Sequence, residues 1–138
     1  MNAEHARRRT IFLIEEDDET RGPLVYNLRS YGYRVVVAVD EEDALERVSG
    51  GGIAADLVLV NLVLKTAEHA LGVGRRVREP AKYDGHTPLV VMPEKYEREL
   101  EDTEVNVGGN DWVFYLGEEA GRLRNLLARL TAKADGGA

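Results

Sequence analysis

Five short apolar runs, separated by segments with helical periodicity, constrain this sequence more than any other feature. The runs are Thr10–Ile14, Tyr33–Val39, Leu57–Val60, Pro88–Met92 and Asp111–Tyr115. Regular alternation of strand-like and helix-like segments favours a parallel sheet with helices on both faces. The sequence therefore predicts an α/β fold, in which a doubly wound sheet of five parallel strands forms the middle of three layers.

The segments between the runs carry helix signals. Gly22-Pro23 predicts a late start for the first helix, because proline is tolerated in the first turn of a helix and not later. Asp40 has the side chain of an N-cap for the second helix. A third, glycine-weakened helix is expected at roughly Thr66–Arg78, and a short charged helix at Glu94–Glu101. The last helix presents a core-facing stripe of Leu123, Leu126, Leu127 and Leu130.

The length of 138 residues fits one domain. We expect a tail at residues 1–9, the folded domain at 10–131 and a second tail at 132–138. Hydrophobic residues make up 43% of the chain and charged residues 31%, which is typical of a globular protein. The sequence contains no cysteine, so disulfides, thiolate metal sites and thiol catalysis are excluded.

Charge and hydropathy narrow the possible partners. The formal net charge is −7, which disfavours binding to nucleic-acid phosphates. The apolar runs are far shorter than the ~20 residues that a membrane-spanning helix needs, and the N-terminus has no apolar stretch typical of a signal peptide. We therefore expect a cytoplasmic domain that binds neither nucleic acid nor membrane.

Four segments at the strand ends resemble, in order, the strand motifs of response-regulator receiver domains, the phosphorylated modules of two-component signalling. They are FLIEEDD at 12–18, DLVLVNL at 56–62, TPLVV at 87–91 and GGNDW at 108–112. Each segment alone is a weak signal, but the four keep a consistent spacing over residues 10 to 130. The resemblance implies the flavodoxin-like (βα)5 receiver fold.

The resemblance also implies which positions carry receiver chemistry. Receivers hold Mg²⁺ with an acidic pair and an aspartate that accepts the phosphoryl group, which a hydroxyl residue and a lysine then bind. By position, the acidic pair is Glu16 and Asp17, and the phosphoacceptor position is Asn61. The hydroxyl position is Pro93 and the lysine position is Tyr115, so three of the five positions depart from the family pattern.

These departures have chemical consequences. The amide of Asn61 is a poor nucleophile, so a stable acyl phosphate is not expected. One carboxylate fewer weakens any Mg²⁺ site, so we expect weak or no binding of Mg²⁺ at Glu16 and Asp17. Pro93 offers no hydrogen-bond donor, and Tyr115 supplies no cation for phosphoryl oxygens. The sequence thus predicts a pseudo-receiver that is not an enzyme and has no catalytic residues.

The resemblance also suggests how such a domain signals. Trp112 occupies the place of the receivers' switch aromatic, although a half-buried core aromatic is the simpler interpretation. The receivers' usual partner surface corresponds to the expected helix Glu94–Glu101, the strand with Trp112 and the polar side of the last helix. Expected partners are a histidine kinase or another signalling protein, and a homodimer through this surface is plausible by resemblance.

Two alternatives remain open. The first is a sensor of a divalent cation or another small ligand that uses the acidic pocket. The second, more remote, is a phosphatase of the haloacid-dehalogenase type, because Glu16, Asp18 and Thr20 loosely resemble that family's D-x-D-x-T loop. That family needs an aspartate nucleophile at the position of Glu16 and a larger chain, and both requirements count against it.

Overall fold

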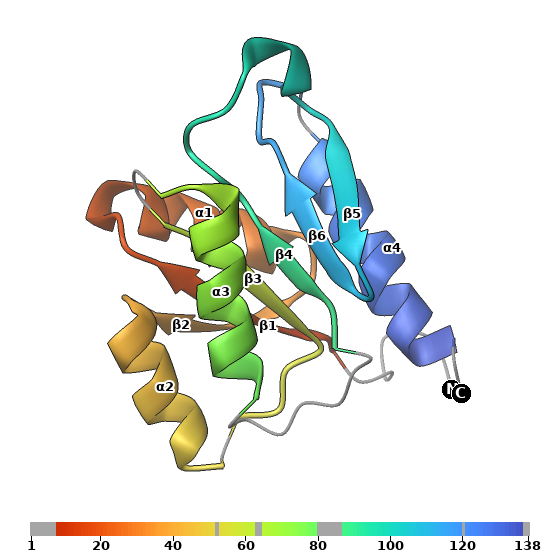
Figure 1. The fold of residues 1–138 in the computed structure, drawn as a ribbon. Coiled ribbons are helices and arrows are strands. Elements are labelled where there is room, and N and C mark those ends of the chain that lie inside the picture. Colours follow the sequence, from red (N-terminus) through yellow and green to blue (C-terminus); the bar gives the residue numbers. More distant parts are fainter. Residues whose placement is uncertain (1–7, 52, 63–64, 80–86, 120, 137–138) are drawn as a thin grey trace.

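A six-stranded sheet forms the centre of the computed structural model, which describes residues 8–51, 53–62, 65–79, 87–119 and 121–136 (Figure 1). The strand order is β2-β1-β3-β4-β6-β5. The strands are β1 (Thr10–Glu15), β2 (Arg34–Ala38), β3 (Leu57–Asn61), β4 (Leu89–Val91), β5 (Glu104–Gly108) and β6 (Asp111–Phe114). All neighbouring pairs are parallel except β5 and β6, which are antiparallel.

Four α-helices cover the two faces of this sheet in the described part of the chain. They are α1 (Asp18–Ser30), α2 (Glu41–Ser49), α3 (Ala67–Arg78) and α4 (Arg122–Gly136). Residues of α2 and α3 share one buried cluster with Phe12 and Val60, whereas residues of α1 and α4 share the other with Leu13 and Leu59. Successive strand residues point to opposite faces, so both faces of β1 and β3 are buried. The predicted three-layer α/β fold is confirmed.

The structure confirms two of the three predicted helix starts. Asp40 and Thr66 are the N-caps of α2 and α3, and their side chains accept hydrogen bonds from the backbone N–H groups of Asp43 and His69. The late start predicted for the first helix is wrong. Asp17 caps α1 instead, so the helix begins at Asp18 and contains Pro23. A capped first turn thus offsets the backbone hydrogen bond that proline removes.

The prediction of a short helix at Glu94–Glu101 is also wrong. That segment contains only a single 3₁₀ turn, Arg98–Leu100, and the chain then forms β5, an additional strand that makes the sheet six-stranded rather than five-stranded. Two apolar side chains, Tyr96 and Leu100, are too few to bury a helix face. β5 has an alternating sequence and joins β6 through a turn at Gly109 and Asn110. Gly108 and Gly109 both have positive φ, which suits this hairpin.

The C-terminal boundary also differs from the expectation. α4 runs to Gly136, so most of the range 132–138 expected as a tail is helical. Helix formers such as Ala132 and Lys133 extend the regular hydrogen-bonding pattern beyond the last buried leucine, Leu130. Residues 1–7 of the expected N-terminal tail lie outside the described residues. Within the described ranges, no helix is long and apolar enough to cross a membrane.

Candidate functional site

The carboxyl ends of β1 and β3 place Glu15 and Asn61 side by side. The two strands pair in parallel register, with Ile14 opposite Val60 and Glu15 opposite Asn61. The next strand in the sheet, β4, pairs Val91 with Val60, so Met92 and Pro93 continue past the same edge. In open α/β sheets this edge is the usual place for a ligand site. The structure therefore brings the predicted phosphoacceptor position Asn61 to the expected edge.

Glu15 is a fully buried carboxyl group held by two donors. Its Oε1 accepts a hydrogen bond of 2.6 Å from Nδ2 of Asn61, and its Oε2 accepts one of 3.1 Å from the backbone N–H of Asp17. Burial raises the pKa of Glu15, and the two hydrogen bonds and Arg21 partly oppose that rise. The amide nitrogen of Asn61, at the predicted phosphoacceptor position, thus donates to a buried carboxyl group.

Asp17 is committed to the start of α1. Its Oδ2 accepts hydrogen bonds from the backbone N–H of Thr20, at 3.1 Å, and from the hydroxyl of Thr20. The hydroxyl bond is the main reason that the pKa of Asp17 is lowered. Since the carboxylate of Asp17 caps the N-terminus of α1, binding a metal ion through it would break the capping hydrogen bonds.

Arg21 stabilises the loop between β1 and α1 through hydrogen bonds and an ion pair. Its Nε donates to the carbonyl oxygen of Glu15 at 2.9 Å, and one Nη donates to that of Glu16 at 3.0 Å. The other Nη forms an ion pair of 2.8 Å with Asp18. The fork of donors on one guanidinium therefore fixes the backbone that carries the acidic cluster.

This arrangement does not fit a magnesium ion. The carboxylate of Glu16 has no partner among the described residues, but Glu15 is tied to Asn61 and Asp17 to Thr20. No group of three or more His, Cys, Asp or Glu side chains in the described ranges could hold a metal. Mg²⁺ requires near-octahedral oxygen ligands, so a cation would have to displace the Asn61–Glu15 hydrogen bond. The cation-sensor alternative gains no support from this geometry.

The hydroxyl and lysine positions are filled by packing side chains. Pro93 is buried directly after β4, and Tyr115 is half-buried after β6 against the cluster of α2 and α3. The ring centroids of Tyr115 and Tyr96 are 5.2 Å apart, and the two rings are tilted relative to each other. Tyr96 in turn donates its hydroxyl hydrogen bond to the carbonyl of Leu116. An aromatic pair thus lies at this end of the edge, at the position predicted to correspond to the receivers' lysine.

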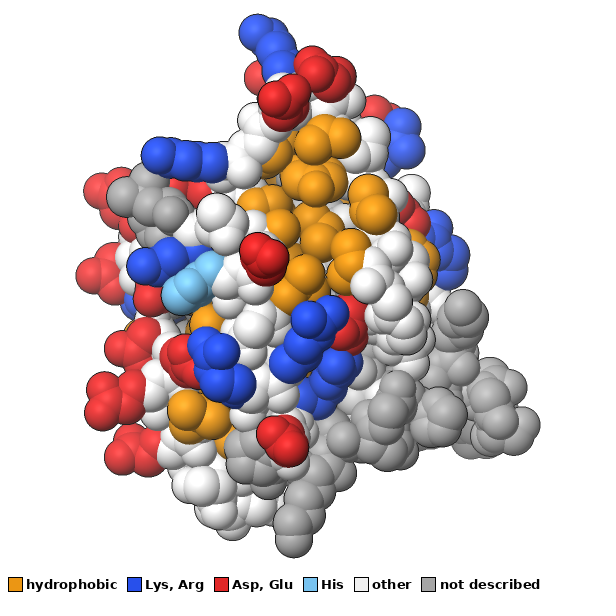
Figure 2. All heavy atoms as spheres, viewed as in Figure 1, with side chains coloured by type: hydrophobic (Ala, Val, Ile, Leu, Met, Phe, Trp, Pro, Cys, Tyr) orange, Lys and Arg blue, Asp and Glu red, His pale blue; other side chains and the backbone are white. Residues whose placement is uncertain are grey.

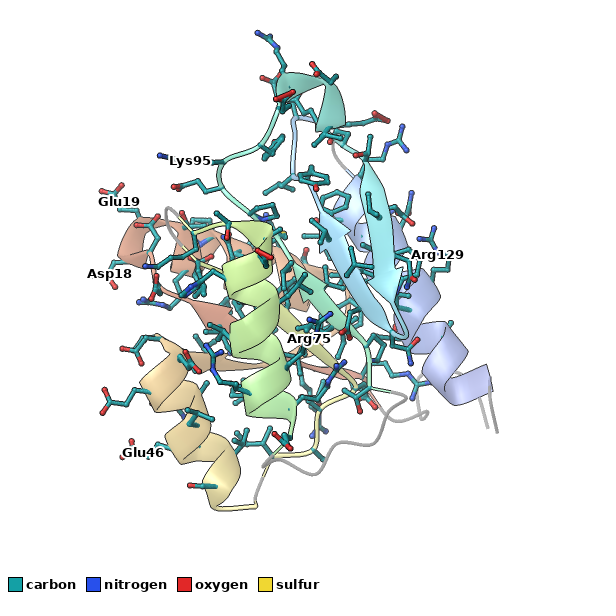
Figure 3. All side chains as sticks on the ribbon, viewed as in Figure 1. Asp18, Glu19, Glu46, Arg75, Lys95 and Arg129 are labelled. Carbon is teal, nitrogen blue, oxygen red and sulfur yellow. The ribbon has the colours of Figure 1, made fainter. Side chains whose placement is uncertain are left out.

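Trp112, the predicted switch aromatic, is half-buried on β6 and packs against the cluster formed by α1 and α4. Figure 3 shows Arg129 on α4. Its guanidinium lies 5.9 Å from the centre of the Trp112 ring. Arg129 also forms an ion pair with Glu104 on β5. The ring of Trp112 therefore lies next to Arg129, whose ion pair with Glu104 connects α4 to β5. The role of Trp112 as a switch stays a prediction.

Glu15 is the site residue that sequence analysis missed. We assigned the acidic pair to Glu16 and Asp17, but it is Glu15 that faces Asn61. A signal for this existed in the sequence. Each of the runs 11–14 and 57–60 contains four apolar residues, and the next residues are Glu15 and Asn61. Pairing these runs end to end would have placed the two side chains together.

Comparisons with known proteins agree with this architecture, although no family model matches the sequence. The receiver protein of a Sinorhizobium medicae response regulator superposes with a TM-score of 0.69 at 17% identity, covering 93% of this chain and 98% of that chain. The N-terminal domain of a response regulator from Carboxydothermus hydrogenoformans also gives 0.69, at 18% identity, with coverage of 94% and 98%.

A third structure is the receiver domain of a sensor histidine kinase from Pseudomonas aeruginosa, solved with a magnesium ion in its active-site cleft. It gives a TM-score of 0.62 at 20% identity and covers 91% of this chain and 99% of that chain. The chain described here has the receiver fold of response regulators. The sequence of the transcription factor prr1 from Schizosaccharomyces pombe is 30% identical over 109 residues, which are 79% of this chain. The matched part spans only 17% of that transcription factor.

Proposed function

We propose that this chain is an atypical receiver domain of a response regulator, which is not phosphorylated and acts by binding another protein. The observation that carries the proposal is the hydrogen bond from the amide of Asn61 to the buried carboxyl group of Glu15. This contact uses the phosphoacceptor position for internal structure. The proposal includes the absence of enzymatic activity.

The chemistry of the surrounding positions supports the same reading. An amide oxygen carries no formal charge and is a weak nucleophile, so attack on a phosphodonor is slow. Pro93 has no side-chain donor and Tyr115 has no positive charge, so neither stabilises a phosphoryl group as charged donors do. All three losses act on the same reaction, and reversing one of them leaves the others in place.

A candidate partner surface lies over β6 and β5, where Figure 2 shows hydrophobic side chains gathered on the face beside α3. Val105 and Val107 on β5 are each 41% exposed, and Leu116 after β6 is 46% exposed. In register, Val105 lies opposite Val113, whose side chain belongs to the buried cluster of α2 and α3. Contiguous apolar patches on a surface are typical of protein interaction sites. A second copy of the chain or a histidine kinase are the partners that we propose for this surface.

Intact mass spectrometry after incubation with Mg²⁺ and acetyl phosphate tests the phosphorylation part. We expect an unchanged mass for the wild-type chain. Asn61→Asp, treated in parallel, should gain at most a minor phosphoryl adduct, because Pro93 and Tyr115 are unchanged. A stoichiometric adduct on the wild type would refute the proposal, and peptide mapping would then identify the residue that took over from Asn61.

Light scattering coupled to size-exclusion chromatography tests the second-copy arm of the binding proposal. A dimer through this surface should dissociate in Val105→Lys, because the added charge lies in the apolar contact. Val39→Lys is the matched control, since Val39 is 44% exposed at the opposite edge of the sheet. Equal masses for the wild type and Val105→Lys would exclude this dimer and leave a different protein as the partner.

A further inference from the structure

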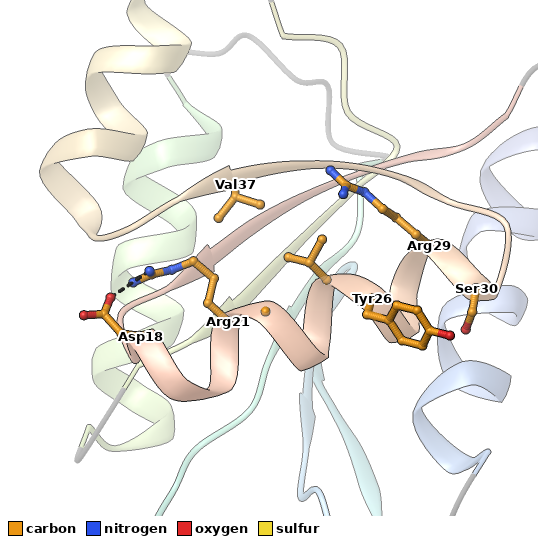
Figure 4. Close-up of a pocket in the computed structure, with 8 residues that line it drawn as sticks. Asp18, Arg21, Tyr26, Arg29, Ser30 and Val37 are labelled. Carbon is orange, nitrogen blue, oxygen red and sulfur yellow. Dashed lines mark hydrogen bonds and ion pairs between the residues drawn. The ribbon is translucent and has the colours of Figure 1, made fainter.

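A groove of about 760 Å³ runs between α1 and β2, away from the site described above (Figure 4). Its volume falls within the roughly 300–1,000 Å³ typical of small-molecule sites. The apolar part of its lining comes from Gly22, Val25 and Tyr26 on α1 and from Val37 on β2. Its polar lining residues are Asp18, Arg21, Arg29 and Ser30. The groove is therefore largely apolar and has basic side chains toward both ends.

Gly22 opens the groove from within the helix. A Cβ atom at this position would meet no atom within 4 Å. Glycine inside a helix costs about 1 kcal/mol relative to alanine, and here no close packing or positive φ requires it. The adjacent Tyr26 is 73% exposed and forms one wall of the groove without covering it. The helix thus leaves apolar surface uncovered at a point where a larger side chain would fit.

The two arginines of the groove differ in their partners. Arg21 is occupied by Asp18 and by the carbonyls of Glu15 and Glu16. Arg29, which extends from the C-terminal part of α1 toward β2, has no acidic partner among the described residues (Figure 4). The chain carries a net charge of −7, and the guanidinium of Arg29 adds a positive charge beside the apolar lining of the groove. Its free donors suit an anion, which a guanidinium can bind in a bidentate way.

We infer that the groove between α1 and β2 binds an organic anion, in which an apolar body contacts Gly22, Val25 and Val37 and an acidic head pairs with Arg29. A carboxylate and a phosphate offer the same recognition chemistry to this arginine. The inference is independent of the proposed function, because the groove uses neither Asn61 nor the surface over β5.

Occupation of the groove would also affect the carboxyl edge of the sheet. The stem of Arg21 lines the groove, while its guanidinium holds the backbone of Glu15 and Glu16. An apolar body packed against this stem would restrict Arg21 and so stabilise the loop that positions Glu15. Ligand binding is thereby connected to the Asn61–Glu15 pair through one side chain.

Titration of the full chain, labelled with ¹⁵N, by octanoate, octyl phosphate, octanol and acetate tests this inference. Octanoate and octyl phosphate should shift the backbone amide signals of Gly22, Val25 and Val37. Octanol and acetate should bind at least about tenfold more weakly, because each lacks one half of the interaction. The ratio of the two anion affinities distinguishes a carboxylate ligand from a phosphate ligand.

Two variants and a control decide the outcome. Arg29→Gln should weaken octanoate binding about tenfold, since it removes the charged donor. Gly22→Leu should abolish binding by filling the groove, and the open space at this position allows it to fold. Arg98→Gln, at an exposed arginine of the 3₁₀ turn, should bind as the wild type does. Unchanged binding in Gly22→Leu, octanol as tight as octanoate, or shifts centred on Val105 and Val107 would each overturn the inference.

Discussion

Asn61 and Glu15 form a hydrogen-bonded pair across two parallel strands, with Nδ2 of Asn61 2.6 Å from Oε1 of Glu15. A buried carboxylate is costly unless donors surround it, and the amide supplies a donor that an aspartate at the same position lacks. Asparagine at position 61 therefore lowers the electrostatic cost of burying Glu15. Predictions about this pair can be tested without knowing the partner of the chain.

Asn61→Asp should destabilise the protein at neutral pH. It replaces the donor with a second carboxylate next to the buried Glu15, so the free energy of unfolding should fall by about 2 kcal/mol. Millimolar Mg²⁺ should restore part of this loss in the variant, because two adjacent carboxylates attract the cation. Urea unfolding with and without Mg²⁺ measures both effects. Asn125→Asp, at an exposed position of α4, is the control, and equal stability of the two variants would contradict the prediction.

Glu15 should make stability fall as pH rises. The pKa of this carboxyl group is raised above 4.5 by burial, so the native state binds its proton more tightly than the unfolded state does. Its contribution is fully present below pH 4.5 and is lost as pH rises through the folded-state pKa. The difference in unfolding free energy between the wild type and Glu15→Gln should therefore shift in favour of the variant over that range.

Urea unfolding between pH 4 and pH 8, a range that starts just below the usual glutamate pKa of about 4.3 and extends well above it, measures this difference. Glu16→Gln is the matched control, because the carboxylate of Glu16 has no partner among the described residues. The control should follow the wild type throughout. Parallel pH profiles of the wild type and Glu15→Gln would show that Glu15 titrates normally.

Gly74→Ala should destabilise the protein although alanine is the better helix former. A Cβ at this position would lie 2.4 Å from Cδ1 of the buried Leu89, so either this side chain or α3 would have to shift. Overpacking of this kind costs about 1–3 kcal/mol. Gly22→Ala, where nothing lies within 4 Å, should instead stabilise by about 0.5–1 kcal/mol. Thermal unfolding of both variants gives the comparison, and shifts of the same sign would refute the packing argument.

Asp111 joins the start of β6 to α3. Its two carboxylate oxygens lie 2.8 Å from Arg75 and 2.8 Å from Arg78, and its side chain is 9% exposed. Asp111→Ala leaves two arginines without their partner and should cost about 2 kcal/mol. Arg76→Ala, which breaks the exposed pair with Glu41, should have a much smaller effect. Chemical unfolding decides between them, and an Asp111→Ala midpoint equal to that of Arg76→Ala would contradict this ranking.

The parallel core was predictable because its signals are local and repeated. Leu57–Val60 is continuously apolar, as a strand covered on both faces must be, and its neighbours show the same pattern. The edge of the sheet was not predicted, because the charged segment Glu94–Glu101 was interpreted as a helix and residues 104–108 were not recognised as a strand. The pattern Glu104-Val105-Asn106-Val107 followed by two glycines is the signal of a hairpin, and it was available in the sequence.

The edge of the sheet that carries the candidate site was predictable from the sequence, but the residue that faces Asn61 was not. Asn61, Pro93 and Tyr115 lie at or just past the strand ends, but Glu16 was chosen over Glu15. An acidic run offers several carboxylates of equal chemistry, and only strand register decides which one is buried. The groove between α1 and β2 had no comparable signal in the sequence. A glycine within a helix indicates only a less stable helix, and the open space beside Gly22 is known only from the structure.

β5 pairs with β6 alone, and none of its five residues is buried. Detaching this strand breaks a single ladder and exposes little apolar surface that water does not already reach. β5 is therefore an edge element whose local opening should cost far less free energy than global unfolding. It is expected to behave as an independent cooperative unit. Amide hydrogen exchange in β5 would then proceed through this local opening, while β1 and β3 exchange only when the whole domain unfolds.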